Sequence, residues 1–357
     1  MDNFSKRLSA VQSMLKDNQA ALVTDEISIL YFTGFPHSEG YLLITRDNSY
    51  LLVDFRYIEA AENTVKSSKV VIFSNAFDTV NELISANNIG EILLESDKIT
   101  VSTFKSMQSS LNADLNDSDL LSGTIQQLRI VKSSDEIEKL KAAQNIAEKA
   151  YLEVLNIVKL GITERQIALE LEYLMKKNGA EKIAFDLITV TGKKTSLPHG
   201  VPGDVEVKDG DFVTFDIGAV YEGYHSDMTR TVAVGNVSDE QREIYNIVLK
   251  AHLAGLEAVK AGVSGFDVDK VCRDIIKDAG YGDFFGHGTG HGVGLEIHEE
   301  PRVSPKGSTI LKSGMIITVE PGIYLPDKFG VRIEDTVLVT EDGYETFAHI
   351  PKELIIL

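Results

Sequence analysis

The sequence predicts an α/β fold arranged as two domains, the second of which contains an internal duplication. Three observations support this prediction. The chain has 357 residues, more than one ordinary core accommodates and enough for two domains. Short strand-like and helical stretches alternate over residues 1–122, as they do in α/β domains. Beyond this region, a series of helix, strand and polar motifs occurs twice in the same order.

Composition limits the classes of partner. The 43% of hydrophobic residues and 25% of charged residues are ordinary for a globular protein. Acidic residues (54) outnumber basic residues (35), which gives a net charge of −19. Nucleic acids and anionic membranes both require a basic surface, so we expect neither as a main partner.

The sequence suits a cytoplasmic protein. Its first residues lack the apolar segment of a signal peptide, and no later apolar run is long enough to span a bilayer. The single cysteine, Cys272, excludes an internal disulfide and suits a reducing compartment. Cys272 lies in an amphipathic run at helical spacing, which predicts core packing rather than a nucleophile.

The first domain is predicted from five strands with helical stretches between them. The strands are Ala20–Val23, Tyr41–Thr45, Tyr50–Val53, Val70–Phe73 and Ile92–Leu94. A helix is expected around Val80–Ser85. The polar stretch Asn112–Gly123 interrupts the pattern and marks the predicted boundary. We therefore expect a first domain over residues 1–122, a linker over 123–135 and a second domain over 136–357.

The second domain is predicted to begin with a long helix. Ser133 and Glu136 have the spacing of a capping box, in which each side chain binds the other residue's backbone N–H. Apolar residues follow at helical spacing at Ile137, Leu140, Ile146 and Ala147.

Two further helices begin the duplicated halves of this domain. One runs from Lys159-Leu-Gly-Ile-Thr163 to Gly179, and the other from Lys260-Ala-Gly-Val-Ser264 to Gly280. Thr163 with Gln166, and Ser264 with Asp267, repeat the same capping pattern.

The likeness between the halves continues into strands that carry acids. The matching positions are Asp216 with Glu320, Asp227 with Glu334, and His199 with His298. Two similar halves that face each other would bring equivalent side chains to a common axis. The repeat therefore predicts where the functional site lies.

Four acids brought together in this way require neutralisation. Asp216 ends an apolar strand, Asp227 follows in a second strand, and the turn Gly218–Gly223 would let the two acids face each other across the ladder. Unit like charges ~4 Å apart repel by roughly 4 kcal/mol at an effective dielectric of about 20. The summed repulsion of several such pairs exceeds the usual free energy of unfolding of a domain, about 5–15 kcal/mol. Protonation or bound cations must relieve this repulsion, and with a histidine nearby we expect divalent metal ions.

The histidine comes from a glycine-rich segment, Gly286–Pro301. His287 and His291 are four apart, but alternating glycines argue against a helix, and the His-Glu-x-x-His order of a mononuclear zinc motif is absent. Such glycines suit an extended backbone that other groups approach closely. Oxygen ligands with one imidazole favour Mn²⁺, Co²⁺, Fe²⁺ or Zn²⁺ over a thiolate-type zinc site. Two such ions can activate water and polarise a carbonyl, which suits amide hydrolysis.

These residues resemble the pita-bread metallopeptidases, and the whole chain resembles their Xaa-Pro branch, aminopeptidase P and prolidase. The motifs are Leu197-Pro-His-Gly-Val-Pro202, Phe215-Asp-Ile-Gly218, Ser226-Asp-Met-Thr-Arg230, the glycine–histidine segment, Val319-Glu-Pro-Gly322 and Gly330-Val-Arg-Ile-Glu-Asp335. Tyr31-Phe-Thr-Gly-Phe35 and Val53-Asp-Phe-Arg56 are similar to the N-terminal domain of the same branch. The resemblance implies a creatinase-like α/β domain followed by a pita-bread domain with a pseudo-twofold duplication.

The resemblance also implies a dinuclear metal site. Two divalent ions, manganese or else cobalt, zinc or iron, would be bound by Asp216, Asp227, His291, Glu320 and Glu334. Asp227 and Glu334 would bridge the ions, and Glu320 would position the nucleophilic hydroxide and act as its general acid/base. Independently, Arg332 and Glu334 share a strand face at i, i+2, which predicts a salt bridge that orients the ligand.

Five further residues would contact the substrate in proteins of this kind. His199 and His298 would flank the scissile Xaa-Pro bond, hydrogen-bond the substrate and stabilise the tetrahedral oxyanion. His287 and Arg332 would line the pocket, with Tyr324 at its rim. Proline lacks an N–H and its amide is tertiary, so peptidases that bind that N–H lose a contact. The implied partners are proline-containing peptides or dipeptides.

The implied function is hydrolysis of the Xaa-Pro bond by an aminopeptidase P or a prolidase. The first removes one residue from longer peptides and the second accepts only dipeptides; the glycine–histidine segment favours aminopeptidase P. Methionine aminopeptidases usually lack a separate domain like residues 1–122, creatine-hydrolysing relatives lack the full carboxylate set, and inactive scaffolds usually lose ligands. We also expect a homodimer in which Tyr31–Phe35 shapes the partner's cleft, with core packing as the alternative.

Overall fold

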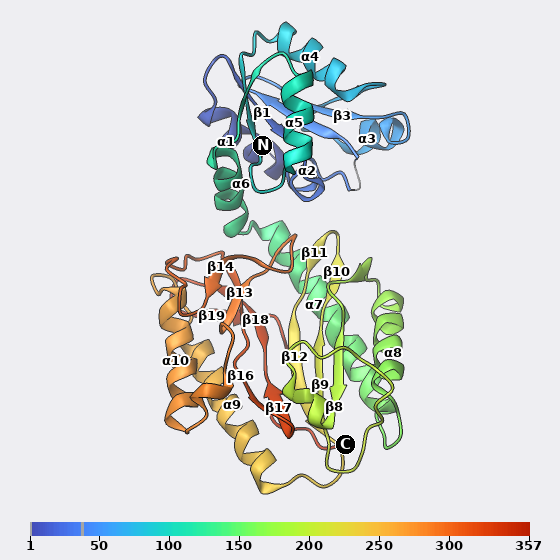
Figure 1. Cartoon of the computed structure of the whole chain (residues 1–357), viewed down its shortest axis with the longest axis vertical. Coiled ribbons are helices and arrows are strands. Elements are labelled where there is room, and N and C mark those ends of the chain that lie inside the picture. Colours follow the sequence, from blue (N-terminus) through green and yellow to red (C-terminus); the bar gives the residue numbers. More distant parts are fainter. Residues whose placement is uncertain (1, 37–38) are drawn as a thin grey trace. The chain divides into compact units, whose positions relative to one another are not determined.

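The computed structural model describes residues 2–36 and 39–357. The chain divides into two compact units, Met1–Arg129 and Ile130–Leu357 (Figure 1). Each unit has its own sheets and its own hydrophobic core.

The first unit is built on a mixed six-stranded sheet in the order β4-β3-β2-β1-β5-β6. Its strands are β1 (Gln19–Val23), β2 (Tyr41–Thr45), β3 (Ser49–Val53), β4 (Lys69–Ile72), β5 (Glu91–Leu94) and β6 (Asp114–Asn116). β2 pairs antiparallel with β1 and β3, whereas the pairs β1–β5, β3–β4 and β5–β6 are parallel. The five strands expected from the sequence all form, and the α/β class is confirmed.

Helices connect and cover these strands. They are α1 (Asn3–Met14), α2 (Glu26–Thr33), α3 (Ile58–Thr64), α4 (Ala76–Ala86), α5 (Val101–Ser110) and α6 (Leu120–Ile130). In α4, Asn75 caps the first turn through the backbone N–H groups of Phe77 and Asp78, and Val80 and Ile84 are buried on one face.

The polar stretch Asn112–Gly123 is not a loop. It contains the edge strand β6 and the start of α6, and the division between the units falls after Arg129. Short polar runs usually indicate loops. Here Leu121 and Ile125, one helical turn apart, are both buried, so α6 has an apolar face that packs against the protein.

The aromatic motif Tyr31–Phe35 lies at the end of α2 rather than in an exposed loop. Tyr31, Phe32 and Phe35 are buried, and the guanidinium of Arg7 lies 3.9 Å from the centre of the Tyr31 ring. This burial supports the alternative, core packing, and a role of the motif at a partner's cleft stays a prediction. The homodimer itself stays a prediction.

The second unit contains the duplicated halves. Its helices are α7 (Ser134–Val154), η1 (Leu155–Ile157), α8 (Glu164–Lys177), η2 (Gly192–Ser196), α9 (Asp239–Ala258), α10 (Gly265–Asp278) and η3 (Gly282–Phe284). Its strands are β7 (Lys182–Ile183), β8 (Ile188–Thr191), β9 (Phe212–Ile217), β10 (Ala219–Tyr221), β11 (Tyr224–His225), β12 (Met228–Ala233), β13 (Gly290–Gly292), β14 (Glu299–Val303), β15 (Ile316–Val319), β16 (Gly322–Leu325), β17 (Phe329–Arg332), β18 (Asp335–Val339) and β19 (Tyr344–Thr346). The main sheets have the orders β12-β9-β8 and β14-β13-β15-β18-β19.

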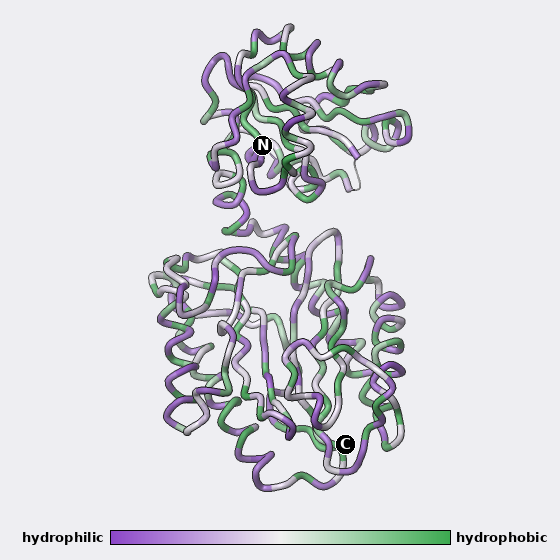
Figure 2. The backbone as a smooth tube through the Cα atoms, in the orientation of Figure 1, coloured by the Kyte–Doolittle hydropathy of each residue, from purple (hydrophilic) through white to green (hydrophobic). Residues whose placement is uncertain are grey.

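The duplication expected from the sequence is visible in these elements. The capping boxes of Thr163 with Gln166 and of Ser264 with Asp267 both form at the starts of α8 and α10. Thr163 forms an isolated antiparallel β-bridge with Glu206, and Ser264 forms the corresponding β-bridge with Ile310. Figure 1 shows α8 on one side of the central strands and α10 on the other, and Figure 2 shows hydrophilic and hydrophobic stretches alternating along both helices.

Each half packs its helices onto its own strands. In the first half, Tyr151 and Leu171 pack with Phe215 of β9. In the second, Cys272 and Ile317 belong to the core formed by α9, α10 and β15. Cys272 is fully buried and burial raises the pKa of its thiol to about 12, so its predicted role in core packing is confirmed.

Candidate metal centre

The five predicted ligands line one cavity of about 820 Å³ in the second unit. Asp216 lies in β9 and Asp227 directly precedes β12, in the first half of the duplication. His291 lies in β13, Glu320 directly follows β15, and Glu334 lies between β17 and β18, in the second half. Residues from both halves therefore converge on the same space.

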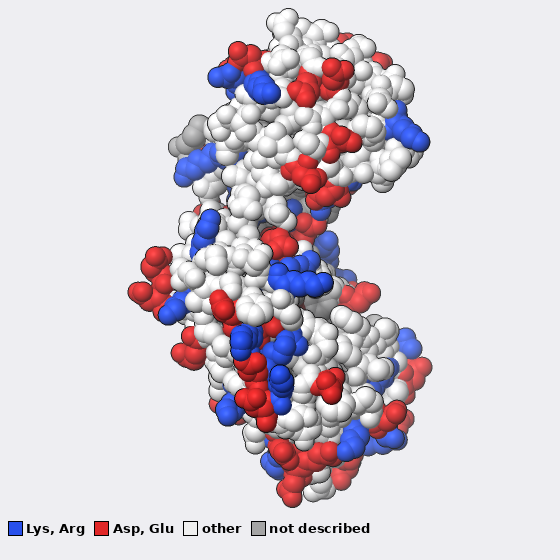
Figure 3. All heavy atoms as spheres, turned by 60° about the vertical axis from the view of Figure 1, so that its left-hand side comes forward, with Lys and Arg blue, Asp and Glu red and all other residues white. Residues whose placement is uncertain are grey.

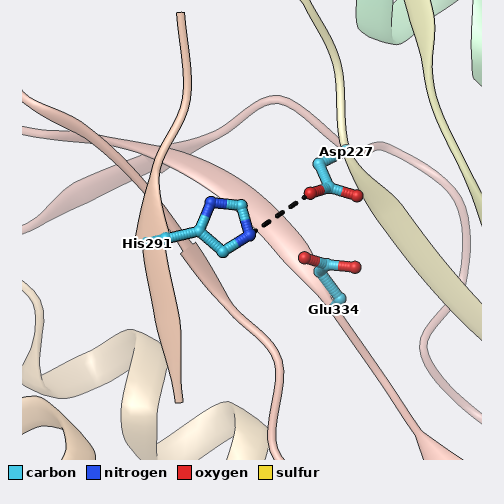
Figure 4. A group of neighbouring side chains, drawn as sticks. All are labelled: Asp227, His291 and Glu334. Carbon is cyan, nitrogen blue, oxygen red and sulfur yellow. Dashed lines mark ion pairs between the residues drawn. The ribbon is translucent and has the colours of Figure 1, made fainter. Parts of the chain in front are cut away.

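Three of these side chains form a compact cluster. Ligand atoms of Asp227, His291 and Glu334 all lie within 4.8 Å of one another (Figure 4). The Nε2 atom of His291 is 3.5 Å from Oδ2 of Asp227 and 3.5 Å from Oε1 of Glu320. One imidazole nitrogen thus faces carboxylate oxygens from both halves.

Contacts across the pseudo-twofold axis hold the two central acids. The N–H of Glu334 donates to the carbonyl of Thr229 at 3.1 Å, and the hydroxyl of Thr336 donates to the carbonyl of Asp227 at 2.9 Å. Thr229 and Thr336 are equivalent in the repeat, as are Asp227 and Glu334. Each acid is therefore hydrogen-bonded to the threonine of the other half, Glu334 as a backbone donor and Asp227 as a backbone acceptor.

Burial makes the cluster unfavourable without a cation. It raises the pKa of Asp227 and of Glu334 well above their ordinary values, with further increases from neighbouring carboxylates, and raises the pKa of Glu320 to about 7. Burial lowers the pKa of His291 to about 3, so its ring is neutral. Its Nδ1 donates to the carbonyl of Gly292 at 3.0 Å, which leaves the Nε2 lone pair facing the acids.

Asp216 has a different neighbour from the one expected. In the ladder it lies opposite Thr229, and Asp227 lies one position beyond the last paired residue of β12. The two aspartates are therefore diagonal neighbours across the ladder and not directly opposite, and both line the cavity. The segment between them forms its own hairpin of β10 and β11.

Arg332 pairs with Asp216 and not with Glu334. Its Nη2 lies 2.5 Å from Oδ2 of Asp216, while Glu334 accepts from the hydroxyl of Thr229 at 2.7 Å. The predicted salt bridge to Glu334 is wrong because β17 ends at Arg332, and strand alternation does not extend through Ile333 to Glu334.

Three pocket residues form a hydrogen-bonded chain. Arg332 donates to the hydroxyl of Tyr324 at 2.9 Å, and this hydroxyl lies 2.8 Å from Nε2 of His287. Nδ1 of His287 donates to the carbonyl of Gly288 at 2.8 Å, and burial lowers the pKa of His287 to about 4. The neutral ring therefore accepts at Nε2 from Tyr324. Tyr324 is 8% exposed and lies behind His287 and Arg332 rather than at the cavity rim, which corrects its predicted place.

His199 and His298 also line the cavity. His199 lies in the exposed turn that follows η2, and His298 directly precedes β14. The His298 ring packs edge-to-face on that of His291, with centroids 4.4 Å apart. Partial burial lowers the pKa of His298, which favours its neutral form.

The glycine–histidine segment is not helical, as expected; it is extended in β13 and again from Glu299, with bends from Gly294 to His298. Added Cβ atoms would lie 2.0 Å from the carbonyl oxygen of Thr318 at Gly290, and 2.2 Å from that of Glu300 at Gly292. Neighbouring backbone therefore lies directly against β13, and only glycine leaves room for it.

Two threonines that the sequence analysis did not identify support the ligands. The hydroxyl of Thr318 accepts from the N–H of His291 at 3.1 Å and donates to Glu320 at 3.4 Å. Thr229 supports Glu334 in the same way. A signal for Thr229 was present, because Asp227-Met-Thr229 and Glu334-Asp-Thr336 repeat a threonine two residues after each acid.

The charged surface of the described residues shows no basic patch on the face in view (Figure 3). On the face shown in Figure 3, Lys and Arg are interspersed with Asp and Glu instead of gathering in one patch. Among residues 2–36 and 39–357, no helix is both long and apolar enough to cross a membrane.

Comparisons with known proteins cover nearly the whole chain. Residues 7–131 match the creatinase/prolidase N-terminal domain, and residues 138–341 match metallopeptidase family M24. A Xaa-Pro dipeptidase of Pyrococcus furiosus is 40% identical over 353 residues, covering 98% of this chain and 99% of the relative.

Two solved structures are also similar. That of a Xaa-Pro dipeptidase from Bacillus anthracis has a TM-score of 0.95 and 40% identity, covering 99% of both chains. That of an X-Pro aminopeptidase from Thermotoga maritima has a TM-score of 0.90 and 37% identity, covering 97% of this chain and 100% of the other.

Proposed function

The chain belongs to metallopeptidase family M24, with a creatinase/prolidase N-terminal domain, and from this premise we propose that it is a Xaa-Pro dipeptidase dependent on two divalent metal ions. The observation that carries the proposal is the buried cluster of Asp227, His291 and Glu334 in the large cavity, with Glu320 beside it. The relatives from P. furiosus and B. anthracis named as dipeptidases support the substrate class.

Aminopeptidase P activity, which the glycine–histidine segment favoured, becomes the second candidate. That segment supplies the imidazole and the cavity wall, and it carries no information on whether the substrate ends after proline. The dipeptidase names among the relatives favour prolidase, while the X-Pro aminopeptidase from T. maritima keeps the alternative open to test.

The donor set fits two hard or borderline divalent ions. Asp216, Asp227, His291, Glu320 and Glu334 would hold them, and manganese is the expected ion because four of the five donors are carboxylates. Oδ1 of Asp216 is buried and lacks a hydrogen-bond partner among the described residues, so it is available as a ligand. The ions would polarise the scissile carbonyl and lower the pKa of a water molecule.

The surrounding residues would perform the remaining steps. Glu320, whose Oε1 lies 3.5 Å from Nε2 of His291, would accept a proton from the attacking water and later donate it to the leaving nitrogen. His298 and His199 line the cavity and would hydrogen-bond the substrate carbonyl as negative charge develops on its oxygen. His287 would form part of the substrate pocket, held in one tautomer by Gly288 and Tyr324.

Apolar lining would accept the proline ring. Leu187, Ile188 and Val201 contribute to the same cavity as the acids. Because proline has no N–H to recognise, its ring must be selected by shape and by apolar contact.

The test compares a dipeptide with a tripeptide that shares its first two residues. Metal-loaded protein should hydrolyse Ala-Pro faster than Ala-Pro-Ala, and His291→Ala should lose metal and at least ~100-fold of the turnover. A faster rate on the tripeptide would establish the aminopeptidase instead. Absence of hydrolysis of either substrate by protein shown to contain metal would refute both candidates.

A further inference from the structure

The two halves of the duplication use corresponding helices differently. Aligning the caps Thr163 and Ser264 places Ala168 of α8 opposite Asp269 of α10. By the same alignment Glu172 lies opposite Arg273. Ala168 and Glu172 line the cavity, whereas Asp269 is buried, with 1% exposure, and is paired with Arg273. The second half therefore carries a charged pair that the first half lacks.

This pair is joined to the backbone of the glycine–histidine segment. Arg273 donates to both carboxylate oxygens of Asp269, at 2.8 and 2.9 Å. Its other contacts are the carbonyls of Phe285, at 3.0 Å, and His287, at 2.8 Å. Asp269 in turn accepts from the N–H of Thr289 at 3.0 Å and from its hydroxyl at 2.9 Å.

The segment held in this way carries groups that face the cavity. His287 lines the cavity and bonds to Tyr324. The carbonyl of Thr289 accepts from the N–H of Glu320 at 2.7 Å. The guanidinium of Arg273 also lies 4.4 Å from the centre of the Phe285 ring, whose edge contacts His287. The pair thus reaches two cavity residues through one stretch of backbone.

An ordinary ion pair on the same helix makes no such contacts. Lys270 and Asp274 are also four residues apart on α10, but both side chains are about half exposed and contact each other on the surface. Asp269 and Arg273 differ because the carboxylate is buried and the guanidinium donors are shared between it and two carbonyls.

We propose that Asp269 and Arg273 are positioning residues that hold the segment Gly286–Thr289 so that His287 forms a fixed wall of the substrate pocket. Neither residue lines the cavity, so they act through the backbone. The planar guanidinium matches this arrangement of three acceptors, and the single ammonium of a lysine does not. The kinetic test of this inference rests on the proposed function, because it measures KM for a Xaa-Pro dipeptide.

The test uses Arg273→Lys, which keeps the charge, and Lys270→Ala as a matched control on the same helix. Arg273→Lys should raise KM for the dipeptide about tenfold, because a displacement of about 1 Å in a positioned group can cost up to roughly 100-fold. Its kcat and metal content should stay within about twofold, because no predicted metal ligand loses a contact. Lys270→Ala should match the wild type in KM, kcat and metal content.

Hydrogen exchange gives a readout that does not depend on the activity. The amides of Gly286–Gly290 should exchange faster in Arg273→Lys than in Lys270→Ala. If Arg273→Lys is poorly folded, Asp269→Asn takes its place, because it removes the carboxylate charge at constant size. It should show the same faster exchange.

Unchanged KM and unchanged exchange would overturn the inference. So would a parallel loss of kcat, metal and thermal stability, which would indicate a general structural role. If the wild type cleaves no Xaa-Pro substrate, the proposed function fails, and the exchange comparison alone decides whether the pair positions the segment.

Discussion

At the residue scale, Glu320 illustrates how burial alters a carboxyl group next to other acids. Burial raises its pKa from an ordinary value of 4.5 to about 7, and the pKa values of Asp227 and Glu334 rise as well. In the folded, metal-free protein these carboxyl groups therefore bind more protons than in the unfolded chain, and their contribution to stability falls as the pH rises. Buried histidines such as His287 and His291, whose pKa values are lowered, contribute in the opposite direction.

We predict a pH-dependent penalty in the chelated protein. The stabilisation from protonated Glu320 is fully present below about pH 4.5 and is lost as the pH rises through about 7. The melting temperature of chelated protein should therefore fall further below that of the manganese-loaded protein as the pH rises across this window, because most other titrating groups are common to both forms. Scanning calorimetry with and without chelator measures it, and Glu320→Gln should flatten the slope.

An equally shallow pH profile in chelated and metal-loaded protein would contradict this prediction. It would mean that the carboxylates separate when no metal is bound, so that their repulsion is relieved by movement instead of by protonation.

At the scale of an element, β13 holds His291 through close backbone contacts. Gly290 lies against the carbonyl of Thr318, whose hydroxyl also accepts from the N–H of His291. Gly286, in the same segment, has no heavy atom near its position for a Cβ. The close spacing of β13 and β15 at Gly290 therefore determines where the imidazole of His291 lies.

We predict that Gly290→Ala separates β13 from β15 and displaces His291. Overpacking of this kind usually costs about 1–3 kcal/mol of unfolding free energy. Metal affinity should fall with it, as measured by titration calorimetry with Mn²⁺. Gly286→Ala is the matched control and should change neither quantity; equal effects from both variants would show that the close approach is not what matters.

At the scale of the whole duplicated unit, Arg230 joins the two halves. Its five N–H donors contact Asp335 and the carbonyls of Thr229, Glu334, Ile350 and Pro351. The carboxylate of Asp335 also accepts from Lys352 at 2.8 Å. Arg230 and Asp335 are 2% and 0% exposed, so neither charge has water as a substitute partner.

We predict a large loss of stability for Arg230→Met. Removing one partner of a buried ion pair usually costs about 3–5 kcal/mol. Asp335 would keep Lys352 as a partner, but it and four backbone carbonyls would lose the buried N–H donors of Arg230. Glu240→Gln breaks the exposed pair of Glu240 with Lys328 and should cost less than about 1 kcal/mol. Thermal unfolding of metal-loaded full-length protein compares the two, and similar losses would contradict the assignment.

Several features of this protein are determined by local sequence and were predictable from it. Neighbours a few residues away determine five of the six strands of the first sheet, the capping boxes at Thr163 and Ser264, and the non-helical backbone of the glycine–histidine segment. The repeated acids also indicated that the two halves meet, because two similar halves that face each other bring equivalent side chains to a common axis. These signals were enough for the fold class and for the family.

Other features depended on tertiary structure. The partner of Arg332, the register that places Asp216 opposite Thr229, the burial of Tyr324 and the contacts of Arg273 all join residues far apart in the chain. The edge strand β6 and the buried motif Tyr31–Phe35 likewise depend on what packs against them. A side chain's residue type determines which bonds it can make, and only the packing of distant elements decides which partner comes within a few ångströms of it.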